Sequence, residues 1–355
     1  MCIRDRDGRP YKVRVADGKE TNYLYPSDLV SSGLDEAACL PQIARAEREA
    51  WRARAPERFE APLRAPLIIV GLPRTGTTFL HHLLSSVPGT RSLAFWQVAH
   101  PFPPLEGPDR RRTVSARLVK RIGNTLPEFT AKHDTDTDAP EECMHIMNLS
   151  FFAWTYWSMA GLPGYREWWW SADPTPAYGA WSDALRFEQA ARPTERLVLK
   201  SPSHTAHLDA LLAAEPDARI VFTHRSPRAV VPSFASLIRT MRRVMYLPEH
   251  LDLHALGAET LDQLGRTADR ARVHRRTIRA DRIVDVPFDD LRADPMGVVE
   301  RVHRSFGFDW NETIAASVRV AVSQNANRKA SGHRYTAAEF GLEPDQIDAR
   351  IRPLL

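Results

Sequence analysis

The sequence predicts an α/β fold with a central, mostly parallel sheet flanked by helices. Strand-like segments occur at 67–70, 196–202, 219–225 and 282–291, and helical patterns follow them along the chain. A run such as LIIV, apolar throughout, is typical of a strand buried on both faces of a parallel sheet. Strands that alternate with helices favour the same class of fold. No Gly/Ser linker interrupts the pattern, so we expect one main domain.

The composition is that of a globular protein. With 355 residues, 43% of them hydrophobic, the chain can bury a sizeable core without disulfides or metal ions. The net charge of +4 is too small to predict a nucleic-acid partner. Cys2, Cys39 and Cys143 have no paired spacing, which predicts no zinc site and is typical of a reducing compartment. We therefore expect a cytoplasmic protein with no metal.

Three parts are expected along the chain. Residues 1–61 form an N-terminal helical extension, of which residues 1–7 are expected to be non-native. Residues 62–342 form the main domain, with a helical, aromatic-rich insertion at about 100–190, and residues 343–355 form a C-terminal tail. Within the extension, the charged segment 35–54 predicts a surface helix, because two acidic residues stand at its start.

The strand at 67–70 leads through the loop GLPRTGTT (71–78) into a helix predicted at 78–86. The two glycines let successive backbone N–H groups turn toward one anion, and the helix N-terminus adds its positive end. The spacing G-x-x-x-x-G matches the P-loop, but Thr77 stands where a nucleotide triphosphatase has lysine. The cation is Arg74, inside the loop. This pattern predicts an anionic nucleotide without the usual triphosphate.

An aromatic segment follows in the predicted insertion. Residues 143–165 contain no Asp, Glu, Lys or Arg, and residues 151–170 hold nine of the 31 aromatic residues. The length suits a membrane span, but several polar residues and a Pro-Gly break at 163–164 oppose one. The favoured interpretation is a buried helix without a membrane span. The functional alternative is an aromatic wall for an apolar acceptor.

Two later segments are also predicted to contain strands of the sheet. Segment 196–202 includes Lys200 and precedes a helix at 204–215. Segment 282–291 predicts another strand, and a helix is predicted to begin near Asp294.

A second candidate anion site begins at Arg225, the last residue of segment 219–225. Ser233 lies eight residues later, inside a helix predicted at 227–246. A strand-end arginine and a serine two turns into the next helix can converge on one phosphate, for which the planar guanidinium is well suited.

Together these segments resemble the PAPS-dependent sulfotransferases, in particular the bacterial branch similar to tyrosylprotein and carbohydrate sulfotransferases. GLPRTGTTFLHHLL is similar to their 5′-phosphosulfate loop, and RIVFTHRSPRAVVPSF to their 3′-phosphate motif. VLKSP resembles the strand end that carries a lysine near the sulfonate, and two later segments, 288–308 and 327–342, resemble a strand-and-helix unit and a basic loop. The resemblance spans residues 62–342 and implies a P-loop-like three-layer fold.

The resemblance also implies a reaction and its residues. The donor would be 3′-phosphoadenosine 5′-phosphosulfate (PAPS), and its sulfonate would pass in line to a hydroxyl or amine of a small-molecule or glycan acceptor, apolar or ring-bearing. No metal ion is implied. Lys200 and Arg74 would stabilise the developing charge. The donor's 3′-phosphate would contact Arg225 and Ser233, and Arg328 and Lys329 would close over the nucleotide. The 5′-phosphosulfate would be held by Arg74, Thr75, Gly76, Thr77, Thr78 and Phe79.

The base that removes the acceptor proton is harder to place. Tyrosylprotein-type members use a Glu some twenty residues after the loop arginine, but here the sequence reads FWQVAHP, and Gln97 cannot act as a base. We rank His204 and Glu142 first and His133 next. Glu142 and His133 lie in the acidic segment KHDTDTDAPEECMH (132–145), which also contains the remaining candidates Glu141 and His145.

Two other functions stay open. A P-loop kinase or nucleotide triphosphatase needs a loop lysine, which is absent, and an Asp for Mg²⁺, for which IVDV (283–286) is a weak candidate. A non-catalytic nucleotide- or RNA-binding protein needs a basic stripe with interleaved aromatic residues. Here the aromatic residues cluster at 151–170, where basic residues are scarce. The sequence gives no indication of an oligomeric state.

Overall fold

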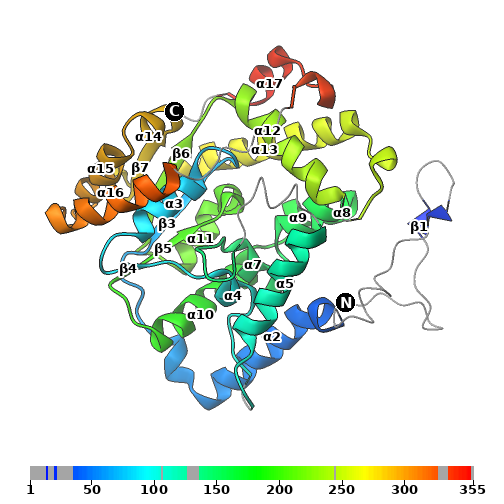
Figure 1. The fold of residues 1–355 in the computed structure, drawn as a ribbon. Coiled ribbons are helices and arrows are strands. Elements are labelled where there is room, and N and C mark those ends of the chain that lie inside the picture. The colour runs from blue at the N-terminus through cyan, green and yellow to red at the C-terminus, as the bar shows by residue number, and fades with distance from the viewer. Residues whose placement is uncertain are drawn as a thin grey trace.

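A parallel sheet forms the centre of the described part of the protein (Figure 1). The structure, a computed structural model, describes residues 13–14, 20–21, 35–104, 107–125, 136–243, 245–326 and 335–352. The strand order is β4-β5-β3-β6-β7, and every neighbouring pair is parallel. The strands are β3 (Leu67–Gly71), β4 (Thr90–Arg91), β5 (Arg196–Lys200), β6 (Arg219–His224) and β7 (Ile283–Pro287). A separate antiparallel pair joins β1 (Val13–Arg14) to β2 (Glu20–Thr21).

The central strand β3 shows why the sheet is covered on both faces. Successive side chains of a strand point to opposite faces, and all five residues of β3 are buried. Leu67 and Ile69 pack in one apolar cluster with helices α3 (Thr77–Ser85), α15 (Pro295–Ser305) and α16 (Glu312–Ala326). Ile68 and Val70 pack in a second cluster, whose helices include α10 (Thr175–Ala191), α12 (Pro227–Arg242) and α13 (Leu253–Arg275). These are the three layers visible in Figure 1. The predicted α/β fold with a central parallel sheet is confirmed.

The α-helices connect the strands and also follow the last of them. Before β5 they are α2 (Asp35–Arg54), α3 (Thr77–Ser85), α4 (Phe95–Ala99), α5 (Arg111–Thr125), α7 (Met144–Met147), α8 (Trp154–Ala160), α9 (Pro163–Ser171) and α10 (Thr175–Ala191). After β5 they are α11 (Leu208–Ala214), α12 (Pro227–Arg242), α13 (Leu253–Arg275), α14 (Phe288–Ala293), α15 (Pro295–Ser305), α16 (Glu312–Ala326) and α17 (Pro344–Arg350). Short 3₁₀ turns lie at Pro56–Phe59, Asn148–Ser150, Pro202–His207 (η4), Pro248–His250, Ala280–Arg282 and Ala338–Phe340.

Two predicted helices differ from the structure. The helix predicted at 204–215 begins as the 3₁₀ turn η4 and becomes α-helical only at Leu208. The hydroxyl of Thr205 explains this, because it accepts a hydrogen bond from the backbone N–H of Gly71 at 2.9 Å and donates to the Gly71 carbonyl at 2.9 Å. These bonds hold the turn against the end of β3. The helix predicted at 227–246 ends at Arg242.

The aromatic segment is folded as the short helices α8 and α9. The side chains of Trp154, Trp157, Trp169 and Trp170 are at most 5% exposed, as the buried-helix interpretation predicts. Among the residues that the structure describes, no helix is long and apolar enough to cross a membrane. Phe151 and Trp168, by contrast, are 44% and 43% exposed. The division at residues 61 and 342 stays a prediction.

Candidate functional site

The loop after β3 has a backbone that requires its two glycines. Gly71 and Gly76 have φ values of +136° and +88°, in the region that favours glycine. A Cβ atom at Gly71 would lie 2.5 Å from the carbonyl oxygen of Thr223, and one at Gly76 would lie 3.0 Å from the ring of Phe288. The loop therefore sits tightly between the ends of β6 and β7. Gly76 is also the N-cap of α3.

The loop threonines have different surroundings. The hydroxyl of Thr75 donates to the carbonyl of Leu72 at 2.6 Å and lies 2.6 Å from the hydroxyl of Thr223, so this buried side chain braces the loop. Thr77 is buried in the first turn of α3, whereas Thr78 is exposed. Phe79 is half-buried. Thr78 is therefore the loop hydroxyl best placed to meet a ligand.

The two predicted anion motifs are in direct contact. Arg74 Nε donates to Ser233 Oγ at 3.1 Å, and Arg225 Nη1 donates to the carbonyl oxygen of Arg74 at 2.9 Å. The guanidinium of Arg225 also lies over the ring of Phe288, 4.2 Å from its centroid. The loop after β3, the end of β6 and the second turn of α12 therefore meet at one point.

Two guanidinium groups in this cluster favour an anion. Burial lowers the pKa of Arg74 below its ordinary value, and the positive charge of Arg225 lowers it further. Arg74 also has a φ of +67°, which is uncommon for a residue with a side chain. An anion beside both arginines relieves their mutual repulsion and replaces lost solvation. The geometry therefore fits a phosphate or sulfonate group.

Lys200 and Glu142 form an ion pair at the end of β5. Lys200 Nζ lies 2.5 Å from Glu142 Oε1 and 3.4 Å from Thr78 Oγ1. The Lys200 side chain is 1% exposed, and that of Glu142 is 15% exposed. The backbone N–H of Cys143 donates to the Lys200 carbonyl at 3.0 Å, which brings the acidic segment to this strand end. Lys200 thus links the carboxylate of Glu142 to Thr78 of the loop after β3.

The other base candidates are placed less favourably. His204 is fully buried, with Nδ1 2.8 Å from the hydroxyl of Tyr178, and burial lowers its pKa to about 3. Without an exposed atom it has no route to an acceptor, so this setting weighs against it. Glu141 is buried and accepts the backbone N–H of Glu142 at 2.8 Å. His145 lies edge-on to Phe95, with ring centroids 5.2 Å apart. His133, Arg328 and Lys329 lie outside the described residues.

Gln97 supports the core and takes no part in this arrangement. Its side-chain amide donates to the buried carboxylate of Glu188 at 2.5 Å, and its oxygen accepts the backbone N–H of Ala94 at 2.9 Å. The position where a base was sought is thus occupied by a structural amide. Sequence reasoning missed Thr205, Thr223 and Phe288, since a lone threonine or phenylalanine after a strand carries no distinctive spacing.

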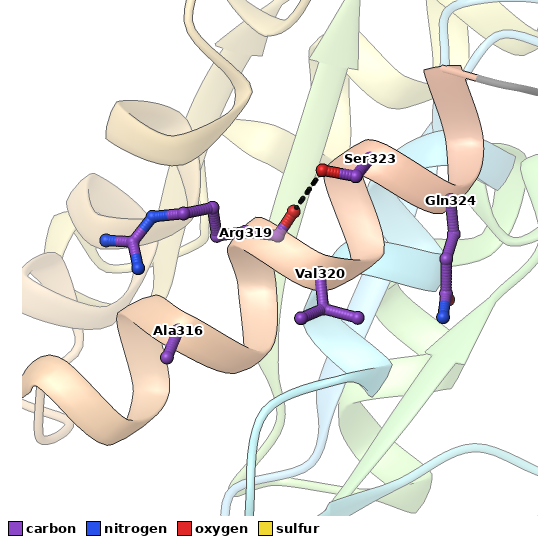
Figure 2. A pocket seen from close by; sticks show the side chains of 5 residues that line it. All are labelled: Ala316, Arg319, Val320, Ser323 and Gln324. Atoms are coloured by element: carbon purple, nitrogen blue, oxygen red, sulfur yellow. Dashed lines mark hydrogen bonds between the residues drawn. The ribbon is translucent and has the colours of Figure 1, made fainter.

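A shallow hollow lies away from these residues, on α16. Figure 2 shows its side chains on one face of this single helix, and none of them is a predicted site residue. They are Ala316, Arg319, Val320, Ser323 and Gln324.

Comparison with known proteins agrees with this geometry. Residues 66–312 match the sequence profile of a sulfotransferase family. The chain is 25% identical over 302 residues to an omega-hydroxy-beta-dihydromenaquinone-9 sulfotransferase, Stf3, of Mycobacterium bovis and of Mycobacterium tuberculosis, covering 78% of this chain and 71% of the relative.

Two solved structures are similar over most of their length. Sulfotransferase STF9 from Mycobacterium avium has a TM-score of 0.78 and 28% identity, covering 88% of this chain and 82% of that one. STF1 from Mycobacterium tuberculosis has a TM-score of 0.70 and 27% identity, covering 91% and 86%. Since the family profile matches more than half of the chain, the chain belongs to the sulfotransferase family, and it is an enzyme that transfers a sulfonate group to an acceptor.

Proposed function

We propose that the sulfonate donor is 3′-phosphoadenosine 5′-phosphosulfate. The observation that carries this proposal is the contact of Arg74 with both Ser233 and Arg225. It places two arginines and a serine beside the N-terminus of α3, which suits a nucleotide with anionic groups at its 3′ and 5′ positions. The donor brings the sulfonate and its leaving phosphate. The residues described here bind, orient and neutralise charge.

The residues divide between the two ends of this nucleotide. Arg225 and Ser233 hold the 3′-phosphate. The 5′-phosphosulfate contacts Thr78 and the backbone N–H groups at the start of α3, whose helix dipole adds positive potential. Arg328 and Lys329 close over the nucleotide in this proposal, as the resemblance implies. Thr75, Gly76 and Thr77 shape the loop, and Phe79 borders it.

Lys200 stabilises charge during the transfer, and Glu142 acts as the general base. Lys200, beside Thr78, stabilises the negative charge that develops on the leaving oxygen, and Arg74 stabilises the sulfonate. Glu142 accepts the proton of the acceptor hydroxyl as that oxygen attacks. The 2.5 Å contact between Lys200 and Glu142 supports this proposal, because it holds the base beside the leaving-group cation.

The acceptor is proposed to be an apolar, ring-bearing hydroxyl compound. The relatives named above act on a hydroxylated dihydromenaquinone. In this chain α8 supplies Trp154, which packs against Phe234, the neighbour of Ser233, with ring centroids 5.9 Å apart. Both rings are buried, so this pair supports the turn of α12 that carries Ser233. A glycan also stacks on tryptophan, so a screen of sulfated products by mass spectrometry distinguishes the two acceptor classes.

The Mg²⁺-dependent kinase alternative is disfavoured by Asp285. This carboxylate accepts hydrogen bonds from Arg275 and lies 2.6 Å from His224 Nε2. Burial raises its pKa, but the hydrogen bonds from His224 and Arg275 outweigh burial and bring the pKa down to about 2. Asp285 is therefore committed to a structural network. The cytoplasmic location stays a prediction.

Isothermal titration calorimetry with adenosine 3′,5′-bisphosphate and with ATP–Mg²⁺ tests the donor proposal. The bisphosphate is expected to bind and ATP–Mg²⁺ to bind weakly, because the loop has no lysine for a γ-phosphate. Tight binding of ATP–Mg²⁺ without binding of the bisphosphate contradicts the proposal.

A further inference from the structure

The hydroxyl of Thr205 joins two segments that each carry a residue of the site. It accepts a hydrogen bond from the backbone N–H of Gly71 at 2.9 Å and donates one to the Gly71 carbonyl at 2.9 Å. Gly71 ends β3, three residues before Arg74, and Thr205 lies in η4, five residues after Lys200. One buried side chain therefore connects the loop after β3 to the segment of the lysine.

Thr205 stands where β5 no longer pairs with β3, its neighbour in the sheet (Figure 1). This pairing ends at Ile69 and Lys200, whereas β6 pairs with β3 as far as Gly71. The carbonyl of Ile69 accepts the backbone N–H of Ser201 at 3.3 Å, so it points toward β5. The N–H and C=O of Gly71, two residues further along, point the same way. Buried backbone groups need partners, and the Thr205 hydroxyl serves both.

The loop after β3 is braced on each side. Toward β6, Thr75 Oγ1 lies 2.6 Å from Thr223 Oγ1. Toward β5, the brace is the hydroxyl of Thr205, on the segment that carries Lys200. Lys200 Nζ lies 3.4 Å from Thr78 Oγ1 of the loop, so a small shift of this segment changes the position of the lysine relative to the loop.

We propose that Thr205 is a positioning residue for sulfonate transfer, whose hydroxyl sets the distance between Lys200 and the loop after β3. The side chain is 0% exposed, so it acts through Lys200 and touches neither donor nor acceptor. A displacement of about 1 Å can lower the rate of an enzyme about 100-fold. The hydroxyl therefore contributes to the rate as well as to stability. This inference rests on the role of Lys200 in the proposed function.

Three variants separate positioning from stability. Thr205→Val keeps the shape of the side chain and removes the hydroxyl, and Thr205→Ser keeps the hydroxyl. The matched control is Thr260→Val on α13, where an equally buried threonine donates to the carbonyl of Leu256 in its own helix at 2.7 Å. The rate measured is the formation of adenosine 3′,5′-bisphosphate from PAPS, with phenol or water alone as the acceptor.

Thr205→Val is expected to lower kcat about 10–100-fold. The affinity for adenosine 3′,5′-bisphosphate should stay within the error of calorimetry, because Arg225, Ser233 and the brace toward β6 remain. Thr205→Ser should restore kcat, and Thr260→Val should keep the wild-type value. A merely structural role instead predicts a loss of stability in urea unfolding without this split between kcat and affinity, and that result overturns the proposal.

A double-mutant cycle with Lys200→Met tests whether Thr205 acts through Lys200. In the Lys200→Met background, Thr205→Val is expected to lower kcat less than about twofold further, because no ammonium group is left to position. An equal loss in both backgrounds overturns the proposal, as does a Thr205→Ser variant as slow as Thr205→Val.

Hydrogen–deuterium exchange of residues 71–78 provides a measurement that needs no turnover. Exchange is expected to be at least about threefold faster in Thr205→Val than in Thr260→Val, since the brace toward β5 is lost. Equal exchange overturns positioning whatever the rates. Failure of the proposed function is seen separately: a Lys200→Met variant with wild-type kcat contradicts the role of Lys200, and a wild type that does not bind the bisphosphate contradicts the donor.

Discussion

Arg225 is the residue whose role is most sharply defined by its contacts. It donates to the Arg74 carbonyl and lies over Phe288, so its guanidinium is fixed before a ligand binds. Arg225→Ala is expected to weaken binding of adenosine 3′,5′-bisphosphate by about 1.5–3 kcal/mol, as loss of a charged hydrogen bond does. Isothermal titration calorimetry measures this loss of binding free energy. Arg228→Ala is the control, because Arg228 pairs on the surface with Asp348 and should leave the affinity unchanged.

Glu142 is expected to set the rate of the chemical step. Glu142→Gln keeps the size of the side chain and a hydrogen bond to Lys200, but the amide cannot accept a proton, so kcat should fall by about 10²–10⁴-fold. Binding of the bisphosphate should stay within the error of calorimetry.

His204 provides the contrast to Glu142. His204→Asn should lower the free energy of unfolding, since the bond to Tyr178 is lost, and leave kcat of the folded enzyme nearly unchanged. A fall in kcat like that of Glu142→Gln, with wild-type stability, assigns the base to His204 and not to Glu142.

The strand-to-helix elements impose their own requirements, and Gly71 at the end of β3 is the clearest case. Gly71→Ala combines a φ of +136° with a Cβ atom 2.5 Å from the Thr223 carbonyl, so we expect a loss of at least about 2 kcal/mol in the free energy of unfolding. Gly179→Ala, in open space within α10, is the control and should raise stability by about 0.5–1 kcal/mol. Urea unfolding measures both; equal effects contradict the described loop geometry.

Two buried histidines on different elements make the fold sensitive to acid. Burial lowers the pKa of His81 on α3, and of His204 in η4, to about 3, below the ordinary value of 6.5. Because only the unfolded chain takes up these protons between those values, stability is intact above pH 6.5 and falls as the pH drops toward 3. Each histidine contributes about 1.4 kcal/mol per pH unit. Unfolding curves from pH 7 to pH 4 measure the slope, which should decrease in His204→Asn.

At the scale of the whole molecule, the sequence predicted the layers better than the connections between them. The apolar runs at β3, β5 and β6 stand out because strands covered on both faces have no polar side. The loop at 71–78 was predictable because its glycines and cation lie within eight residues. The pairing of Arg74 with Ser233, which lie 159 positions apart in the chain, depends on the strand order that places β6 beside β3. A local sequence pattern does not predict the order of the strands in the sheet.

The proton acceptor shows the same limit. In the sequence, His204 lies four residues after Lys200 and Glu142 lies in a separate acidic segment, and only tertiary packing decides between them. Tyr178 and Trp181 of α10 enclose His204 completely, whereas the bond from Cys143 to the Lys200 carbonyl leaves Glu142 at the surface of the site. The membrane-length aromatic segment is likewise resolved by packing, since most of its tryptophans face the core and only part of it reaches solvent.

A crystal structure of the enzyme with adenosine 3′,5′-bisphosphate tests the proposed nucleotide site most directly. The 3′-phosphate is expected within hydrogen-bond distance of Arg225 and Ser233, and the 5′-phosphate at the N-terminus of α3 beside Thr78 and Lys200. A nucleotide bound elsewhere, or bound with its 3′-phosphate away from Arg225 and Ser233, contradicts it.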